Sequence, residues 1–270
     1  MTDRAAPLRV GILGWGAIGR ELGQAIAAAN AGGDETLELV AVSSRFTNDP
    51  VHRLAVEPEQ LGLRCDVVVE AAGPAPLAVN AERWLTDGAD VIVVSIGALV
   101  DDALHRRLIA AGPGRLLLCA GAIGGLDLLA AAELYGPIDE VRLETTKPSA
   151  TLVRDWMDQP MLDALRSGER PVECFRGSVA DAVELFPESL NVSAALGLAA
   201  GDFDAVEVVV TGSPNAGGNS HDISIDAASG QYRVSVCNTP SPTNPRTSHI
   251  TAWSVLRSLR SLAGRPGAFV

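Results

Sequence analysis

The 270-residue sequence is poor in aromatic residues and has no long apolar run. Aromatic residues make up 4% of the chain, and no window of about 18 residues is apolar throughout. A membrane-spanning helix needs about 20 consecutive apolar residues, and the first ten residues lack the apolar stretch of a secretion signal. The sequence therefore predicts a soluble, cytoplasmic protein with no membrane partner.

Basic residues and paired cysteines are also scarce. The net charge is −12, so the chain lacks the positive charge that would replace the counterions of a nucleic acid. The four cysteines lie far apart and form no CxxC pair, which favours buried free thiols over a metal site or a disulfide framework. We expect no nucleic-acid partner and no metal.

Hydrophobic residues, by contrast, are abundant at 47%, and 20% of the chain is charged. This composition is typical of a folded protein with a large core, in one large domain or two modest ones. Up to about residue 120, apolar runs alternate with helical patterns. The expected strands are 8–13, 37–43, 65–71, 90–95 and 115–119, and the expected helices are 17–30, 78–87 and 101–111. Continuous apolar strands in this order predict an α/β fold, a doubly wound parallel sheet of the Rossmann type.

The pattern changes after Gly121. A helix over 126–135 precedes extended segments that alternate polar and apolar residues, which predicts a second α/β domain with an open mixed sheet. These segments are 140–146, 205–211, 221–227 and 231–238, and an amphipathic helix over 248–262 follows. Its apolar face needs a partner, so we expect it to pack on the first sheet. The predicted domains are 1–120 plus a C-terminal helical segment of about 243–264, which bind a dinucleotide, and 121–242, which carry substrate and catalysis.

Gly14, Gly16 and Gly19 form a GxGxxG motif between the first strand and the first helix. The first glycine permits the tight turn, the second lets the backbone approach a pyrophosphate, and the third packs the helix on the sheet. With Ala17 and Ile18 at the helix start, these residues predict a site for NAD or NADP. The alternative is a glycine-rich turn in some other doubly wound protein.

The second expected strand ends in Ser43, Ser44 and Arg45, where an NAD-binding chain would carry a carboxylate for the ribose 2′-hydroxyl. Hydroxyls and a guanidinium suit a 2′-phosphate, so acceptance of NADP is favoured, unless Arg45 is simply a solvated loop residue. After the third strand, the small residues Ala72 and Gly73 leave room for the nicotinamide ribose, although an ordinary turn would look the same.

Among the histidines, only His221 directly follows a glycine-rich loop and precedes an expected strand. Loops of this kind often carry site residues, and imidazole exchanges protons near neutral pH. From the residues alone, His221 is either a catalytic acid-base or a hydrogen-bonded histidine of a strand.

Five ordered motifs give the chain a resemblance to the L-aspartate dehydrogenase family. They are GAIGGLD at 121–127, TTKP at 145–148, NVSAAL at 191–196, NSHDI at 219–223 and NPRTS at 244–248. The resemblance implies a Rossmann domain followed by an α/β domain with an open sheet. It also implies NAD(P)-dependent oxidation of L-aspartate to iminosuccinate, which water converts to oxaloacetate and ammonia, and the reverse amination.

The resemblance also implies roles for single residues. Ala122 would contact the cofactor through its backbone amide, Asn191 would bind the nicotinamide end, and His221 would be the catalytic acid-base. The chain departs from the family's pattern at Asp222, where relatives often carry Glu. An orienting role for this carboxylate is therefore an open question, and the Ser-Ser-Arg run puts strict use of NAD in doubt.

Two substrate carboxylates would need donors, for which the sequence offers Lys147, Asn219, Arg246, Thr247 and Ser248, the last two at the expected helix start. We expect a homodimer, because the open sheet of the second domain would need covering. The competing hypotheses are an imine or semialdehyde reductase for another small acid, and a catalytically silent NAD(P)-sensing protein.

Overall fold

The computed structural model describes residues 6–45, 53–187 and 190–264. It divides into two compact units. Unit 1 comprises Met1–Gly121 and Thr251–Val270, and unit 2 comprises Ala122–Ile250.

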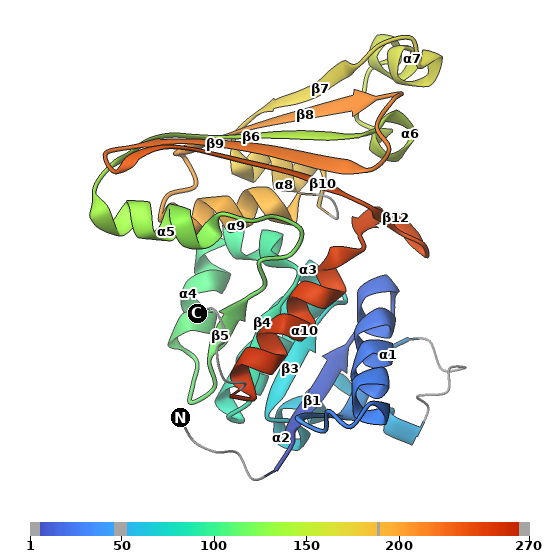
Figure 1. Cartoon of the computed structure of the whole chain (residues 1–270), viewed down its shortest axis with the longest axis vertical. Helices are drawn as coiled ribbons and strands as arrows, with labels where there is room; N and C mark the ends of the chain where they lie inside the picture. The colour runs from blue at the N-terminus through green and yellow to red at the C-terminus, as the bar shows by residue number, and fades with distance from the viewer. Residues whose placement is uncertain (1–5, 46–52, 188–189, 265–270) are drawn as a thin grey trace. The chain divides into compact units, whose positions relative to one another are not determined.

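Unit 1 is built on a five-stranded sheet in the order β2-β1-β3-β4-β5, with every pair parallel (Figure 1). The strands are short and almost wholly apolar because helices cover the sheet. They are β1 (Leu8–Leu13), β2 (Leu37–Ser43), β3 (Val67–Glu70), β4 (Asp90–Val93) and β5 (Leu116–Leu118). The helical elements are α1 (Ala17–Ala31), η2 (Pro58–Gln60), α2 (Leu61–Arg64), α3 (Pro74–Thr86), η3 (Ile96–Val100), α4 (Asp102–Ala110) and α10 (Ile250–Leu262).

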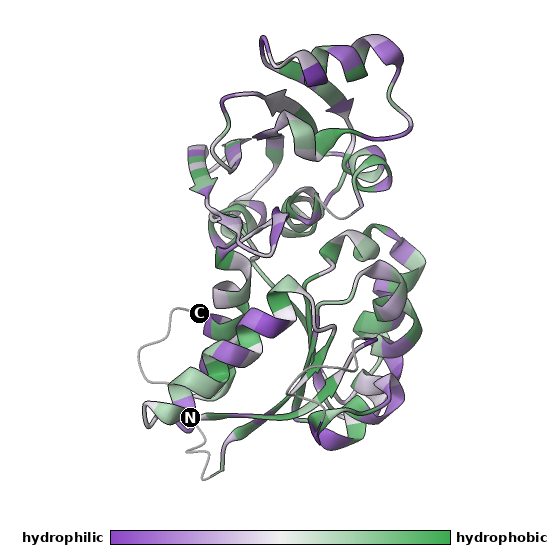
Figure 2. Cartoon of the chain, turned by 90° about the vertical axis from the view of Figure 1, so that its right-hand side faces the viewer, coloured by the Kyte–Doolittle hydropathy of each residue, from purple (hydrophilic) through white to green (hydrophobic). Residues whose placement is uncertain are grey.

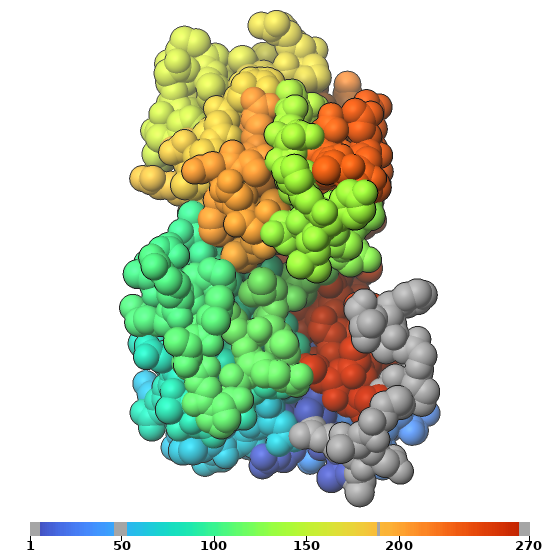
Figure 3. Space-filling model, turned by 90° about the vertical axis from the view of Figure 1, so that its left-hand side faces the viewer, coloured from blue at the N-terminus to red at the C-terminus, as the bar shows by residue number. Residues whose placement is uncertain are grey.

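The last helix, α10, returns to unit 1 and packs on its sheet. Val255, Leu256 and Leu259 are buried in one core cluster with Val10 and Ile12 of β1. Figure 2 shows apolar and polar residues alternating along this helix, and its outer side reaches the surface in Figure 3. The apolar side of α10 thus completes the core of unit 1.

The expected start of this C-terminal segment, at about 243, was too early. Residues Asn244–Ser248 form a strand of unit 2, and α10 begins only at Ile250. Asn244 and Pro245, two poor helix formers, head this stretch, and the strand pairs with Pro240–Ser241. Local pairing therefore extends unit 2 up to the first turn of the helix.

Unit 2 is built on a mixed sheet in the order β10-β9-β6-β8-β7, in which only β6 and β8 run parallel. Its strands are β6 (Ile138–Pro148), β7 (Val172–Gly177), β8 (Val206–Ser213), β9 (Asn219–Ala227) and β10 (Gly230–Asn238), with the small pair β11 (Pro240–Ser241) and β12 (Asn244–Ser248). Its helices are α5 (Leu126–Tyr135), α6 (Ser149–Leu152), α7 (Gln159–Ser167), α8 (Val179–Leu185) and α9 (Asn191–Ala199).

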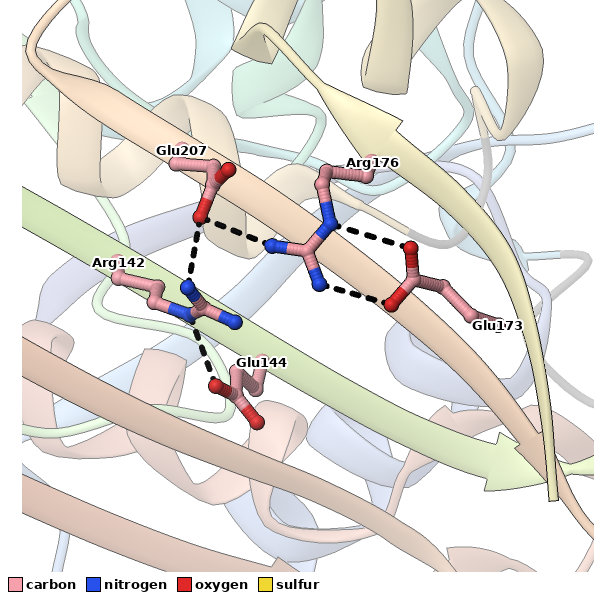
Figure 4. Close-up of polar contacts among 5 residues, drawn as sticks. All are labelled: Arg142, Glu144, Glu173, Arg176 and Glu207. Atoms are coloured by element: carbon pink, nitrogen blue, oxygen red, sulfur yellow. Dashed lines mark hydrogen bonds and ion pairs between the residues drawn. The ribbon is translucent and has the colours of Figure 1, made fainter.

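The two faces of this sheet differ in chemistry. Val141, Leu143, Ile223 and Ile225 alternate toward the buried face, on the side of α5, α8 and α9 (Figure 1). The opposite face carries a network of ion pairs that crosses three strands (Figure 4). In it Arg142 contacts Glu144 and Glu207, and Arg176 contacts Glu207 and Glu173. This charged face explains the polar-apolar alternation in the sequence.

The expected fold class, a Rossmann sheet followed by an α/β domain with an open mixed sheet, is confirmed. The elements between β6 and β8, namely β7 and α6 to α9, were not predicted from the sequence. These are helices of four to nine residues and an edge strand, too short for a clear periodic pattern. In the described residues, no helix is long and apolar enough to cross a bilayer.

Candidate cofactor and substrate sites

The loop between β1 and α1 brings the three motif glycines into three different environments. Gly14 has a φ of +95°, and a Cβ there would lie 2.4 Å from the carbonyl oxygen of Ala71. A Cβ on Gly19 would lie 2.0 Å from the oxygen of Gly14, whereas one on Gly16 would meet nothing within 4 Å. Gly14 and Gly19 thus allow close packing of one backbone segment on another, whereas Gly16 leaves open space beside the loop.

The first turn of α1 carries no acidic side chain, and no side chain caps it. Ala17 and Ile18 begin the helix, whose free N–H groups carry the positive end of the helix dipole. A helix start of this kind after a glycine turn is suited to phosphate groups.

A cavity of about 680 Å³ lies beside this loop in unit 1. It brings together predicted residues from three strand ends, namely Gly14, Gly16, Ser44, Arg45 and Ala72. Gly73 follows with a φ of +109° and directly precedes α3, and the buried Gly19 packs beneath the loop. A concave site with exposed backbone and an anion-binding helix end fits a dinucleotide.

The same cavity contains a carboxylate that the sequence analysis missed. Ala55 forms a bridge with Val42, and the N–H of Val56 donates to the oxygen of Val42 at 3.0 Å. These contacts bring Glu57 into the cavity lining with Arg45. The sequence carried no local signal for this, because the two residues are joined only by tertiary pairing.

In unit 2, the buried face of the sheet turns from apolar to polar at one end. Thr145 of β6 lies directly opposite His221 of β9. Lys147 and Asn219, two residues further along each strand, point to the same face because strand side chains alternate. All four side chains are buried, with at most 2% exposed. This polar cluster lies on the same sheet face as the apolar residues Leu143 and Ile223 and follows them along the strands.

His221 contacts the hydroxyl of Thr145 and lies within the electrostatic reach of Lys147. Its Nδ1 lies 3.0 Å from Oγ1 of Thr145. Burial, followed by the charge of Lys147, lowers the pKa of His221 to about 4, although Asp222 opposes this shift. The ring is therefore neutral at physiological pH. When Nδ1–H donates to Thr145, the lone pair of Nε2 remains to accept a proton.

Lys147 is the single lysine of the chain and is 2% exposed. Burial, followed by the positive charges of Arg154 and Arg246, lowers its pKa to about 8. Burial and both arginines disfavour the ammonium form of Lys147. A bound anion would favour the ammonium and so offset their effect on the pKa. The cluster is electrostatically suited to a negatively charged ligand.

The remaining predicted donors of unit 2 lie around this cluster. Nδ2 of Asn219 donates to Oγ of Ser248 at 3.4 Å, and the buried Oδ1 of Asn219 accepts no hydrogen bond from the described residues. Thr247 and Ser248 belong to β12 and not to a helix start, so that part of the expectation was wrong. Their hydroxyls are placed by strand pairing.

Two further residues come from the loop before α5 and from α9. The carbonyl oxygen of Ala122 accepts from Nδ2 of Asn238 at 2.8 Å, which fixes the loop to the end of β10. Asn191 is the first, half-buried residue of α9. Asp222, next to His221 on β9, points to the opposite face and accepts from Ser235. It does not orient the imidazole; the hydroxyl of Thr145 does, and the sequence analysis did not single it out.

A parallel α/β sheet with this glycine loop, joined to an α/β unit with a polar cluster on its sheet, defines an NAD(P)-dependent dehydrogenase. Residues 14–113 match the NAD-binding domain of homoserine dehydrogenase, and residues 127–262 match the C-terminal domain of aspartate dehydrogenase. The chain belongs to the L-aspartate dehydrogenase family, as its motifs predicted.

Named relatives support the same assignment along almost the whole length. L-aspartate dehydrogenase 2 of Bordetella pertussis is 37% identical, over 93% of this chain and 96% of the relative. The enzyme of Methanocaldococcus jannaschii is 35% identical, over 95% and 97%. The crystal structure of aspartate dehydrogenase from Thermotoga maritima superposes with a TM-score of 0.75 at 26% identity, covering 97% of this chain and 99% of that one.

Proposed function

We propose that this protein oxidises L-aspartate to iminosuccinate, which water converts to oxaloacetate and ammonia, and that it catalyses the reverse amination. The observation that carries the proposal is the buried polar cluster of unit 2, in which Lys147 lies within the electrostatic reach of Arg154 and Arg246. A dicarboxylic amino acid brings two negative charges to such a cluster. Lys147, Asn219, Thr247 and Ser248 are the proposed donors to its carboxylates.

His221 is the proposed acid-base. Its ring is neutral at physiological pH, and Thr145 holds Nδ1 at 3.0 Å. Nε2 is then the atom that takes a proton during oxidation and returns it during amination. A bound aspartate carboxylate would raise the low pKa of this imidazole toward neutrality, because a nearby negative charge favours the protonated ring.

The proposed cofactor site is the cavity of unit 1, with Gly14, Gly16 and the start of α1 at Ala17 and Ile18 toward the phosphates. Gly19 would keep the helix close enough for this, and Ala72 and Gly73 would line the ribose. When bound, the nicotinamide supplies the hydride acceptor for oxidation or the hydride donor for amination. By family resemblance, the backbone of Ala122 and the side chain of Asn191 would also contact it.

NADP(H) is the proposed cofactor alongside NAD(H). Ser43, Ser44 and Arg45 lie in the lining of the cavity and could hold a 2′-phosphate. Glu57 lies in the same lining and favours a free 2′-hydroxyl. The balance between Arg45 and Glu57 is therefore expected to set the preference between the two cofactors.

The test is a spectrophotometric screen at the reduced-nicotinamide band with NAD⁺ and NADP⁺. L-aspartate should be oxidised, whereas L-asparagine, which replaces one carboxylate with a neutral amide, should react far more slowly. L-glutamate and D-aspartate control for length and stereochemistry. A preference for a monocarboxylic substrate would support an imine or semialdehyde reductase. Cofactor binding without turnover of any substrate would support an NAD(P)-sensing protein.

The open, charged face of the unit 2 sheet supports a homodimer as the assembly. Multi-angle light scattering of the purified protein should give twice the chain mass of 28.0 kDa. Arg176→Glu, which reverses one charge of the network in Figure 4, should shift the protein toward the monomer. A monomer at all concentrations of the wild type would contradict the proposal. The cytoplasmic location stays a prediction for cell fractionation.

A further inference from the structure

Glu70, the last residue of β3, is a buried carboxylate for which the proposed chemistry has no use. Its side chain is fully buried, and in the described residues it is the only acidic side chain buried to this degree. Burial raises the pKa of Glu70, while hydrogen bonds from neighbouring backbone amides and a hydroxyl oppose that shift. An acidic group at such a position needs a specific reason, because a neutral side chain of the same size would be buried at far lower cost.

Four hydrogen bonds converge on this carboxylate from two different loops. Oε1 accepts from the N–H groups of Ala72 at 2.7 Å and Gly73 at 2.8 Å, and from the hydroxyl of Ser95 at 3.0 Å. Oε2 accepts from the N–H of Ser95 at 3.0 Å. One side chain therefore ties the loop after β3 to the turn after β4.

The loop that Glu70 holds forms a wall of the dinucleotide cavity. Ala71 and Ala72 line the cavity together with Gly14. The N–H of Ala71 donates to the oxygen of Leu13 at 2.8 Å, and the closest atom to a Cβ on Gly14 would be the oxygen of Ala71. Because this loop packs directly against the glycine loop, a small shift of its backbone would change the space left for the cofactor.

A glutamine could not replace the carboxylate in this arrangement. Three backbone N–H groups and one hydroxyl are donors, and they require acceptor atoms at both ends of the group. A carboxamide has one acceptor oxygen, and its NH₂ would face either Ser95 or the N–H groups of Ala72 and Gly73. At least one buried donor would lose its partner, so the two loops could no longer be held in the same position.

We propose that Glu70 is a positioning residue for the cofactor: its ionised carboxylate holds the Ala72–Gly73 backbone and the Ser95 turn where NAD(H) or NADP(H) binds. The inference rests on the proposed cofactor site of unit 1. Glu70 acts through these loops and touches neither the substrate nor the reacting atoms. It therefore affects the affinity for the dinucleotide and leaves the chemical step unchanged.

The test compares Glu70→Gln with Ser95→Ala, which removes only the hydroxyl and keeps the backbone N–H. Fluorescence titration with NADPH and NADH gives the Kd, and steady-state kinetics give kcat and KM for each substrate. Glu70→Gln should raise the Kd and KM of the cofactor about ten- to a hundredfold, as expected for lost hydrogen bonds to a charged group. The kcat at saturating cofactor and the KM of aspartate should stay within about twofold.

Ser95→Ala should raise the cofactor Kd only a few-fold, with a melting temperature close to that of the wild type. If Glu70→Gln does not fold, Ser95→Ala decides alone, and a wild-type Kd in it would overturn the proposal. A Glu70→Gln enzyme with a lower kcat and melting temperature but an unchanged cofactor KM would also overturn it, because that result describes a purely structural residue.

The titration separates this inference from the proposed reaction. A wild type that binds NADPH but does not oxidise aspartate would contradict the substrate, and the effect of Glu70→Gln on the Kd would still decide the role of Glu70. A wild type that binds neither NADH nor NADPH would overturn the cofactor site and this inference together.

Discussion

The two candidate sites differ in the groups that form them, which are mainly closely packed loops in one and titratable side chains in the other. The cofactor cavity of unit 1 depends on close backbone packing: the glycine loop and the small residues after β3 line it, with Arg45 and Glu57 among its side chains. The cluster of unit 2 is formed by side chains, with Lys147, His221 and Thr145 on one buried sheet face. One site is therefore defined by shape and the other by titratable groups.

The difference follows from the two sheets. In unit 1, parallel strands are covered by helices and end together at one edge, where loops present their N–H groups. In unit 2, one sheet face is buried, and the polar residues at its end are desolvated, which lowers the pKa of both Lys147 and His221. Substitutions in the glycine loop should thus act through steric contacts, and substitutions in the polar cluster should act through charge and proton transfer.

The strongest expected effect tests the chemical side of this comparison. His221→Ala should lower kcat about 10²- to 10⁴-fold, the usual contribution of general acid-base catalysis. Thr145→Val, which keeps the shape but removes the hydroxyl from Nδ1, should lower kcat about five- to tenfold. Steady-state kinetics measure both effects. The Kd for NADPH should not change in either variant, and near-normal kcat in His221→Ala would remove this residue from the mechanism.

The steric side is tested by two neighbouring glycines. Gly14→Ala should reduce the free energy of unfolding by about 2–5 kcal/mol, because the new Cβ meets backbone and the φ of +95° is strained for alanine. Gly16→Ala is the matched control, since its Cβ meets nothing and stability should change by at most about 1 kcal/mol. Urea unfolding measures both. Gly16→Ala should nevertheless weaken NADPH binding. Equal losses of unfolding free energy in the two variants would contradict the different backbone surroundings of Gly14 and Gly16.

The pH dependence of dicarboxylate binding sharpens the comparison further. The pKa of Lys147 is lowered to about 8, so the ammonium is present below pH 8 and is lost as the pH rises above it. Succinate has no amine of its own to titrate, and its inhibition constant should be flat between about pH 7, where both carboxyl groups are ionised, and pH 8, and rise about tenfold per pH unit above it. Lys147→Met should give weak inhibition at every pH. The same pH step in that variant would assign the titration to another group.

The smallest expected effect concerns two charged side chains in the lining of the cofactor cavity, Arg45 and Glu57. Arg45→Asp should move the preference from NADP toward NAD by about 1–2 kcal/mol, since the guanidinium is exposed. Glu57→Gln should move it the other way. The ratio of kcat/KM for the two cofactors is the measurement. A wild type that rejects NADP(H) would show that the Ser-Ser-Arg loop does not bind a 2′-phosphate.

Much of unit 1 was predictable from the sequence, because its signals are local. Apolar runs specify the buried parallel strands, which are three to seven residues long, and the spacing of Gly14, Gly16 and Gly19 specifies the turn between the first strand and its helix. Unit 2 was less predictable: its short helices and edge strand left no periodic pattern, and the early start given to the last helix ignored the pairing of β12 with β11.

By itself, the sequence determined the fold class, the family and the chain segments that carry the candidate residues. These depend on residue types at fixed spacing along one chain. Only the tertiary structure decided that Thr145 faces His221, that Asp222 faces away, that Glu57 reaches the cavity and that Glu70 joins two loops. Each of these facts depends on strand register or on contacts between segments that are distant in the sequence. The pairing of whole strands determines them, and no local sequence pattern encodes them.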